Sequence, residues 1–272
     1  MKKKHVFLDN NEKIGYATYG DGAHSLILFH GLVGSALLDT ATTADLPASD
    51  VRLVVVERPG YGESDCIEMD KVSDFNPMLE RVMSELDIRH ADLVGISAGA
   101  SYAYAAAGAW PEKVGTVYIL GGLPAVYRKS ILDVYPESEQ AFYDSIRSKS
   151  LKAVQDIFYD IMTPDAPVRG GKNMPVDKWL AESIKNNCHG MANQVMLQIQ
   201  HWGVELEQIR SKVRLYHSPH DEEVPFAAAE LMAGLFPDAE LIPCQAFDAS
   251  QKEIHVKSIG HGLDWVLSHY KS

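Results

Sequence analysis

An apolar run that turns into the pentapeptide Gly95-Ile96-Ser97-Ala98-Gly99 constrains this chain more than any other feature. The run from Ala91 predicts a buried strand, and the small residues that continue to Trp110 predict a helix. Glycines on both sides of Ser97 indicate that strand and helix backbones approach too closely there for a β-carbon. Such a turn lifts the serine hydroxyl out of the sheet and holds it at a helix N-terminus, where oriented N–H groups stabilise negative charge.

Further buried strands alternate with helices along the chain, and this cadence predicts the fold class. Strands followed by covering helices predict a largely parallel sheet with helices on both faces, an α/β fold with an eight-stranded sheet. The residues from Asp74 to Ile88 have apolar side chains at helical spacing, and Pro225 favours a helix to Phe236. The strand candidates are His5–Leu8, Lys13–Tyr19, Ser25–His30, Val51–Glu57, 91–96, Val114–Leu120, Val213–His217, Glu240–Cys244 and Lys252–Val256.

The cadence stops between Pro124 and Glu205, where only helical patterning is evident. A structureless loop of that length is improbable in a compact chain, so we expect an inserted helical cap over 124–205 and a core domain formed by 1–123 and 206–272. Aromatic side chains of the cap that face the sheet would line a pocket. The polar cap residues with the potential to contact a substrate are Asp165, Arg169, Lys172, His189 and His201.

Charge and cysteine usage exclude several classes of partner. The chain has 272 residues and a formal net charge of -12, which opposes binding to nucleic acid or to an anionic membrane. Three widely spaced cysteines fit reduced thiols better than a disulfide framework. The apolar run after Met1 is too short for a signal peptide, and no later run has the length of a membrane span. We therefore expect a cytoplasmic protein whose partner is a small molecule.

Chemistry at Ser97 requires a histidine to accept its proton, because a serine hydroxyl at its ordinary pKa is a poor nucleophile. Among eleven histidines, His261 is favoured, since Gly260 and Gly262 place it in a loop that can reach across a site. His255 is the next candidate, although it falls inside a predicted strand. His217 ends a strand, and His220 adjoins the acid.

A carboxylate must hold the histidine in the productive tautomer. Asp221 follows the predicted strand ending at His217, and so lies at the same sheet edge as Ser97. Its neighbours Glu222 and Glu223 compete for this role, but we expect them to begin a solvated helix face instead. The predicted triad is therefore Ser97, Asp221 and His261.

An oxyanion site needs two convergent backbone N–H groups, one from the residue after the nucleophile and one from the loop after an earlier strand. Those residues are Ala98 and Leu32. His30 precedes this loop, and we interpret it as a residue that structures the loop, not as a base.

Together these motifs resemble those of the α/β-hydrolase fold superfamily, in its lid-bearing form. The resemblance covers nearly all of the chain outside the predicted cap. Two departures affect the expected pocket: the loop after His30 lacks the proline common in that family motif, and residues 246–251 look inserted before the final strand. The resemblance is carried by His30-Gly31, Arg58-Pro59-Gly60-Tyr61-Gly62-Glu63-Ser64, Gly95-Ile96-Ser97-Ala98-Gly99, Asp221 with Val224-Pro225, and Gly260-His261.

The resemblance implies a serine hydrolase that acts on a small or medium carboxylic ester through an acyl-enzyme, without a cofactor or a metal. Three other functions stay open on the same triad: carbon–carbon bond hydrolysis, hydroxynitrile cleavage and peptide hydrolysis. A ligand receptor that retains the fold is a fourth alternative, because fold does not fix function. The sequence indicates neither the substrate nor the oligomeric state.

Overall fold

Eight strands form a single sheet in the order β1-β2-β4-β3-β5-β6-β7-β8. The computed structural model describes residues 3–38, 46, 50–163 and 178–271. β1 and β2 run antiparallel to their neighbours and all later pairs are parallel, which confirms the predicted sheet. The strands are β1 (Lys4–Phe7), β2 (Lys13–Tyr19), β3 (His24–Phe29), β4 (Val51–Val56), β5 (Ala91–Ile96), β6 (Val114–Leu120), β7 (Val213–His217) and β8 (Ala239–Pro243).

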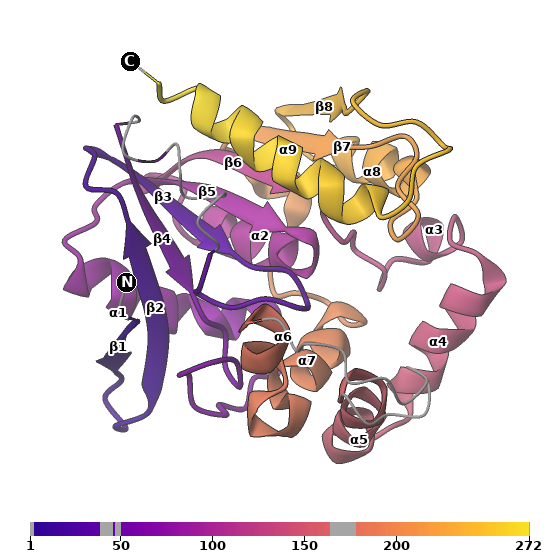
Figure 1. The fold of residues 1–272 in the computed structure, drawn as a ribbon, viewed down its shortest axis with the longest axis horizontal. Helices are drawn as coiled ribbons and strands as arrows, with labels where there is room; N and C mark the ends of the chain where they lie inside the picture. The colour runs from indigo at the N-terminus through magenta and orange to yellow at the C-terminus, as the bar shows by residue number, and fades with distance from the viewer. Residues whose placement is uncertain (1–2, 39–45, 47–49, 164–177, 272) are drawn as a thin grey trace.

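Helices cover both faces of the sheet (Figure 1). They are α1 (Asn76–Glu85), α2 (Ala100–Ala109), α3 (Lys129–Leu132), α4 (Glu137–Arg147), α5 (Leu151–Met162), α6 (Lys178–Ser183), α7 (Lys185–Gln198), α8 (Phe226–Ala233) and α9 (Ile254–Ser268). Short 3₁₀ turns occur at Val72–Phe75, Ser97–Gly99 and Leu206–Gln208. None of these described helices is both long and apolar enough to cross a bilayer.

The central strands are buried on both faces, as their continuous apolar runs predict. Along β3, Ile27 and Phe29 pack into the cluster formed with α1 and α2, whereas Leu26 and Leu28 pack into a second cluster with the α9 residues Leu263, Val266 and Leu267. Successive side chains of a strand point to opposite faces, so a single run fills two cores. Because β3, β5 and β7 run in the same direction, the loops that follow them emerge at the same edge of the sheet.

The strand predicted over Lys252–Val256 is wrong. These residues lead into α9, which begins at Ile254 and continues to Ser268. Glu253 precedes the helix with a left-handed φ of 56°. The Gly260-His261-Gly262 segment, expected in a loop, therefore lies in the middle of a helix.

Helices α3 to α7 occupy the segment between β6 and β7 where a cap is predicted. In Figure 1, α4 and α5 stand away from the sheet, while α6 and α7 lie below its central strands. Ser183 at the end of α6 accepts from the amide of Gly34 at 2.8 Å and donates to its carbonyl at 2.9 Å. This helix is thereby joined to the loop that follows β3.

Candidate active site

Ser97 occupies a sharp turn between β5 and α2, with a backbone φ of 46°. This left-handed conformation is strained for a residue with a β-carbon. A β-carbon at Gly99 would lie 2.2 Å from the Phe29 carbonyl oxygen, and one at Gly95 would lie 2.7 Å from the Ala100 α-carbon. Only glycine fits at either position, so the Gly-x-Ser-x-Gly pattern is a steric requirement of this turn.

A chain of hydrogen bonds runs from Ser97 through His255 to Asp221. The Ser97 Oγ lies 3.2 Å from the His255 Nε2, and the Asp221 Oδ2 accepts from the His255 Nδ1 at 2.8 Å. The other Asp221 oxygen accepts from the amides of Glu223 at 2.9 Å and Val224 at 2.8 Å. With Nδ1–H bound to the carboxylate, Nε2 is left free to accept the serine proton.

His261 does not belong to this chain, and its predicted place in the triad is corrected here. It lies six residues beyond His255 on α9, about 9 Å further along the helix axis. Its Nδ1 is 2.5 Å from the Tyr216 hydroxyl, and the two rings stack with centroids 5.9 Å apart. Because α9 starts earlier than predicted, His255 occupies the first helical turn and faces Ser97 instead.

Burial and charge act in opposite directions on the His255 pKa. Burial alone would lower it, but the Asp221 hydrogen bond and the charges of Asp221, Glu223 and Glu222 outweigh that effect and raise the pKa above its usual value. Burial would raise the Asp221 pKa, yet the contacts with His255 keep it below its usual value. The carboxylate therefore stays ionised and stabilises a protonated His255.

Glu222 and Glu223 do not begin a helix, contrary to the sequence expectation, since α8 starts at Phe226. The Glu222 Oε2 accepts from the amides of Ile254 at 3.1 Å and His255 at 3.3 Å, which caps the N-terminus of α9. The Glu223 Oε2 lies 3.7 Å from the His255 Nε2. Both carboxylates consequently lie beside the histidine that faces Ser97.

Leu32 and Ala98, the predicted oxyanion donors, line the same cavity as Ser97. A β-carbon at Gly31 would be 3.5 Å from the Ser97 β-carbon, so this loop passes directly beside Ser97. The hydrogen bonds between described residues include none donated by the Leu32 or Ala98 amides. Both N–H groups therefore remain available to a ligand oxygen.

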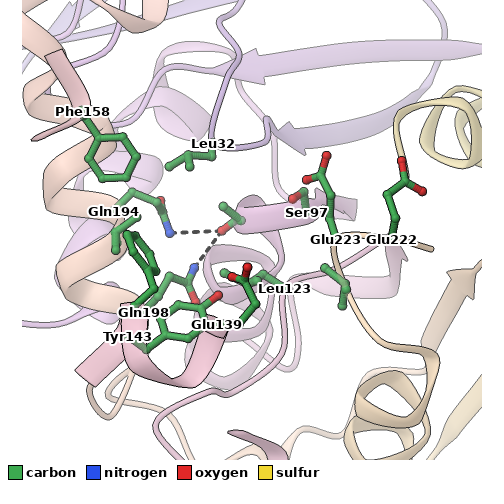
Figure 2. A pocket seen from close by; sticks show the side chains of 14 residues that line it. Leu32, Ser97, Leu123, Glu139, Tyr143, Phe158, Gln194, Gln198, Glu222 and Glu223 are labelled. Carbon is green, nitrogen blue, oxygen red and sulfur yellow. Dashed lines mark hydrogen bonds between the residues drawn. The ribbon is translucent and has the colours of Figure 1, made fainter. Parts of the chain in front are cut away.

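The cavity in front of Ser97 has a volume of about 320 Å³. In Figure 2, Glu222 and Glu223 lie on the Ser97 side of the cavity, and Gln194 and Gln198 of α7 lie on the opposite side. Gln194 and Gln198 on α7 donate to the Ala98 carbonyl at 3.2 and 3.0 Å. The lining residues are Leu32, Ser97, Ala98, Leu123, Glu139, Phe142, Tyr143, Phe158, Gln194, Val195, Gln198, Glu222, Glu223 and Val224.

This lining is acidic and aromatic: it contains three glutamates, and none of its described residues is a lysine or an arginine. Of the predicted polar cap contacts, Asp165, Arg169 and Lys172 lie outside the described residues. His189 and His201 are not among the lining residues. Over the described part of the chain, no group of three histidine, cysteine or carboxylate side chains could hold a metal ion.

Comparisons with known proteins agree with this fold. A sequence profile of the alpha/beta hydrolase family matches residues 26–249. A 2-hydroxy-6-oxononadienedioate/2-hydroxy-6-oxononatrienedioate hydrolase of Escherichia coli O139:H28 is 31% identical over 266 residues, covering 93% of this chain and 86% of the relative. The chain belongs to the alpha/beta hydrolase family.

Two further matches cover less of the relative or have lower sequence identity. A protein of the same name from Paraburkholderia phymatum is 35% identical, but over 115 residues only, so the match spans 40% of that relative's length. An esterase from Exiguobacterium antarcticum superposes with a TM-score of 0.71 over 98% of this chain and 99% of its own, at 17% identity. A likeness at that identity concerns the fold and leaves the substrate open.

Proposed function

We propose that this chain is a serine hydrolase that cleaves an uncharged carboxylic ester or a related acyl substrate through an acyl-enzyme. The observation that carries the proposal is the hydrogen-bonded chain from Ser97 through His255 to Asp221 at a strained turn. Nucleophile, base and orienting acid are within reach of one another, which is the geometry that activates a serine hydroxyl.

In the acylation step, the Ser97 Oγ attacks the substrate carbonyl carbon while the His255 Nε2 accepts the hydroxyl proton. The Asp221 carboxylate stabilises the resulting imidazolium. The carbonyl oxygen becomes an oxyanion, which the Leu32 and Ala98 amides bind. His255 then donates its proton to the departing alkoxide, and the acyl group remains on Ser97.

In the deacylation step, a water molecule takes the place of the departed alcohol. His255 removes its proton as the water oxygen attacks the acyl carbon, and the same two amides bind the second oxyanion. Collapse of this intermediate releases the carboxylic acid and returns the proton from His255 to Ser97. The Glu223 carboxylate, 3.7 Å from the His255 Nε2, adds a further charge that favours the imidazolium.

The charge of the cavity supports an uncharged substrate. Glu139, Glu222 and Glu223 line it, and no described lysine or arginine does. A dioate of the kind named for the E. coli relative carries two carboxylates. Such a substrate would meet like charges without a described cationic partner, which costs about 1 kcal/mol for each close pair even in water.

Carbon–carbon bond hydrolysis is the second candidate, because the relative that matches 93% of this chain is named as such a hydrolase. It would use the same three residues on a ketone carbonyl. Cleavage of 2-hydroxy-6-oxononadienedioate in the absence of any ester turnover would favour this candidate over the ester.

The proposal is tested with a fluorophosphonate probe and a matched pair of esters. We expect the wild type to be labelled and Ser97→Ala to remain unlabelled. 4-Nitrophenyl pentanoate and 4-nitrophenyl hemiglutarate share an acyl chain length and differ in a terminal carboxylate. We expect the neutral ester to be favoured by about tenfold or more, the factor that 1.4 kcal/mol of repulsion gives. Glu139→Gln should narrow that ratio, and a preference for the anionic ester would contradict the proposed substrate.

A further inference from the structure

Arg58, which lies two residues beyond the end of β4, is a buried cation with no carboxylate partner among the described residues. It is 1% exposed, and no described carboxylate lies within ion-pair distance of it. Its neighbour Glu57 pairs instead with Lys3 at 2.6 Å. Burying an unpaired charge is unfavourable, and a neutral side chain would fill this space at lower cost. The contacts of the guanidinium therefore require an explanation beyond packing.

The guanidinium donates both of its terminal groups to the loop that passes Ser97. Nη1 donates to the His30 carbonyl, and Nη2 donates to the Gly31 carbonyl at 2.9 Å. The rings of Tyr61 and Tyr102 flank the charge, with centroids 4.9 and 5.1 Å from the guanidinium carbon. The cation thus replaces a carboxylate partner with two backbone carbonyls and two aromatic faces.

A second donor reaches the same carbonyl. The His30 Nδ1 is 2.8 Å from the Gly31 oxygen, and since that oxygen can only accept, the Nδ1 carries the hydrogen. Burial and the adjacent Arg58 charge hold the His30 pKa well below its usual value, so the ring is neutral. The Gly31 carbonyl is therefore bound on both lone pairs, once by a charged donor.

The Gly31 carbonyl and the Leu32 N–H belong to one peptide group. Hydrogen bonds to a peptide oxygen polarise the whole group and make its N–H a stronger donor. Leu32 supplies one of the two oxyanion donors in the proposed mechanism. We propose that Arg58, assisted by His30, is a positioning residue that fixes and polarises the Leu32 peptide for binding the oxyanion. This inference rests on the proposed serine hydrolase activity.

The expected effect follows from two magnitudes. Loss of a whole oxyanion donor lowers kcat by about 10²- to 10³-fold, and each added bond in a chain strengthens its neighbours by about 10–30%. Removing one donor from the Gly31 carbonyl should therefore lower kcat by about 2- to 8-fold, with KM for the neutral ester unchanged. Arg58→Lys tests this with the charge retained, and His30→Phe removes the other donor while keeping an aromatic ring.

Tyr61→Phe is a matched control. The Tyr61 hydroxyl donates to the Leu32 carbonyl at 2.9 Å, in the same loop but in the following peptide group, whose N–H belongs to Val33. A merely structural role of this loop would make Tyr61→Phe as harmful as the other two substitutions. If the peptide group between Gly31 and Leu32 is the one that matters, Tyr61→Phe should keep kcat within about twofold of the wild type.

The decisive readout compares an aryl trifluoromethyl ketone, which forms an oxyanion on Ser97, with the corresponding carbinol, which cannot. Arg58→Lys and His30→Phe should weaken ketone inhibition by the same factor as kcat and leave carbinol inhibition unchanged. If either variant folds, is still labelled by the fluorophosphonate and keeps the wild-type kcat and ketone affinity, the inference about Arg58 and His30 is overturned, while the proposed function stands. A wild type that neither labels nor turns over ester would contradict the proposed function and this inference with it.

Discussion

The two candidate histidines of α9 provide a direct test, because the same substitution can be made at both. In the native protein the His255 Nδ1 lies 2.8 Å from Asp221. The glutamine amide of His255→Gln can still donate a hydrogen bond, but it cannot accept a proton at neutral pH. Loss of the general base in a serine triad lowers kcat by roughly 10⁴- to 10⁶-fold, about 5–8 kcal/mol of transition-state stabilisation.

His261→Gln removes the 2.5 Å pairing with the Tyr216 hydroxyl and the ring contacts with Tyr216 and Phe247, none of which involves Ser97. A hydrogen bond of this kind contributes about 1 kcal/mol to folding, so the melting temperature should fall by a few degrees, about 2–4 °C, while kcat stays within twofold. Turnover of 4-nitrophenyl pentanoate and thermal melting of both variants measure these quantities. A 10⁴-fold loss in His261→Gln with near-wild-type turnover in His255→Gln would refute the assignment of His255.

Three further outcomes follow from the same geometry. Activity should rise with pH, and the midpoint of this rise should lie above the ordinary histidine pKa of about 6.5, because His255 must be deprotonated and its pKa is raised. Glu223→Gln should lower the midpoint of the kcat profile, because the Glu223 charge helps to raise that pKa. Asp221→Asn should lower kcat by about 10⁴-fold through the wrong tautomer, as steady-state kinetics would detect, with an unchanged circular dichroism spectrum. Gly99→Ala places a β-carbon 2.2 Å from the Phe29 carbonyl oxygen, so it should lower the free energy of unfolding by about 1–3 kcal/mol and abolish fluorophosphonate labelling. A variant that keeps wild-type stability and labelling would count against the steric requirement.

The sheet and the Ser97 turn could be predicted because local patterns encode them. Strands buried on both faces appear as continuous apolar runs, and the turn at Ser97 leaves two glycines in the sequence. Asp221 follows the end of β7 closely, so its position depends little on the rest of the fold. These features need no knowledge of distant contacts.

The sequence favours His261 over His255 because the strand predicted over Lys252–Val256 conceals the start of α9. Glycines beside His261 favour a loop in the sequence, yet a β-carbon at Gly262 would lie 2.9 Å from both Leu120 and Tyr216. The glycine thus serves close packing of the helix on the sheet. A helical signal was present: the buried residues of α9, which are Ile254, His255, Ser258, Gly262, Leu263, Val266 and Leu267, recur at three- and four-residue spacing.

The role inferred for Arg58 could not be predicted from the sequence, for a different reason. Its partners are the carbonyls of His30 and Gly31, and backbone carbonyls occur at every residue. No side-chain pattern marks which of them a buried guanidinium will reach. The capping of α9 by Glu222 was hidden in the same way, since it depends on where that helix begins.

The central claim is that the Ser97 hydroxyl is an activated nucleophile. The most direct measurement is peptide mass mapping of the wild type and His255→Gln after brief exposure to a fluorophosphonate. We expect a single adduct on the peptide containing Ser97, formed orders of magnitude more slowly in His255→Gln. An unlabelled wild type, or an adduct on another serine, would contradict it.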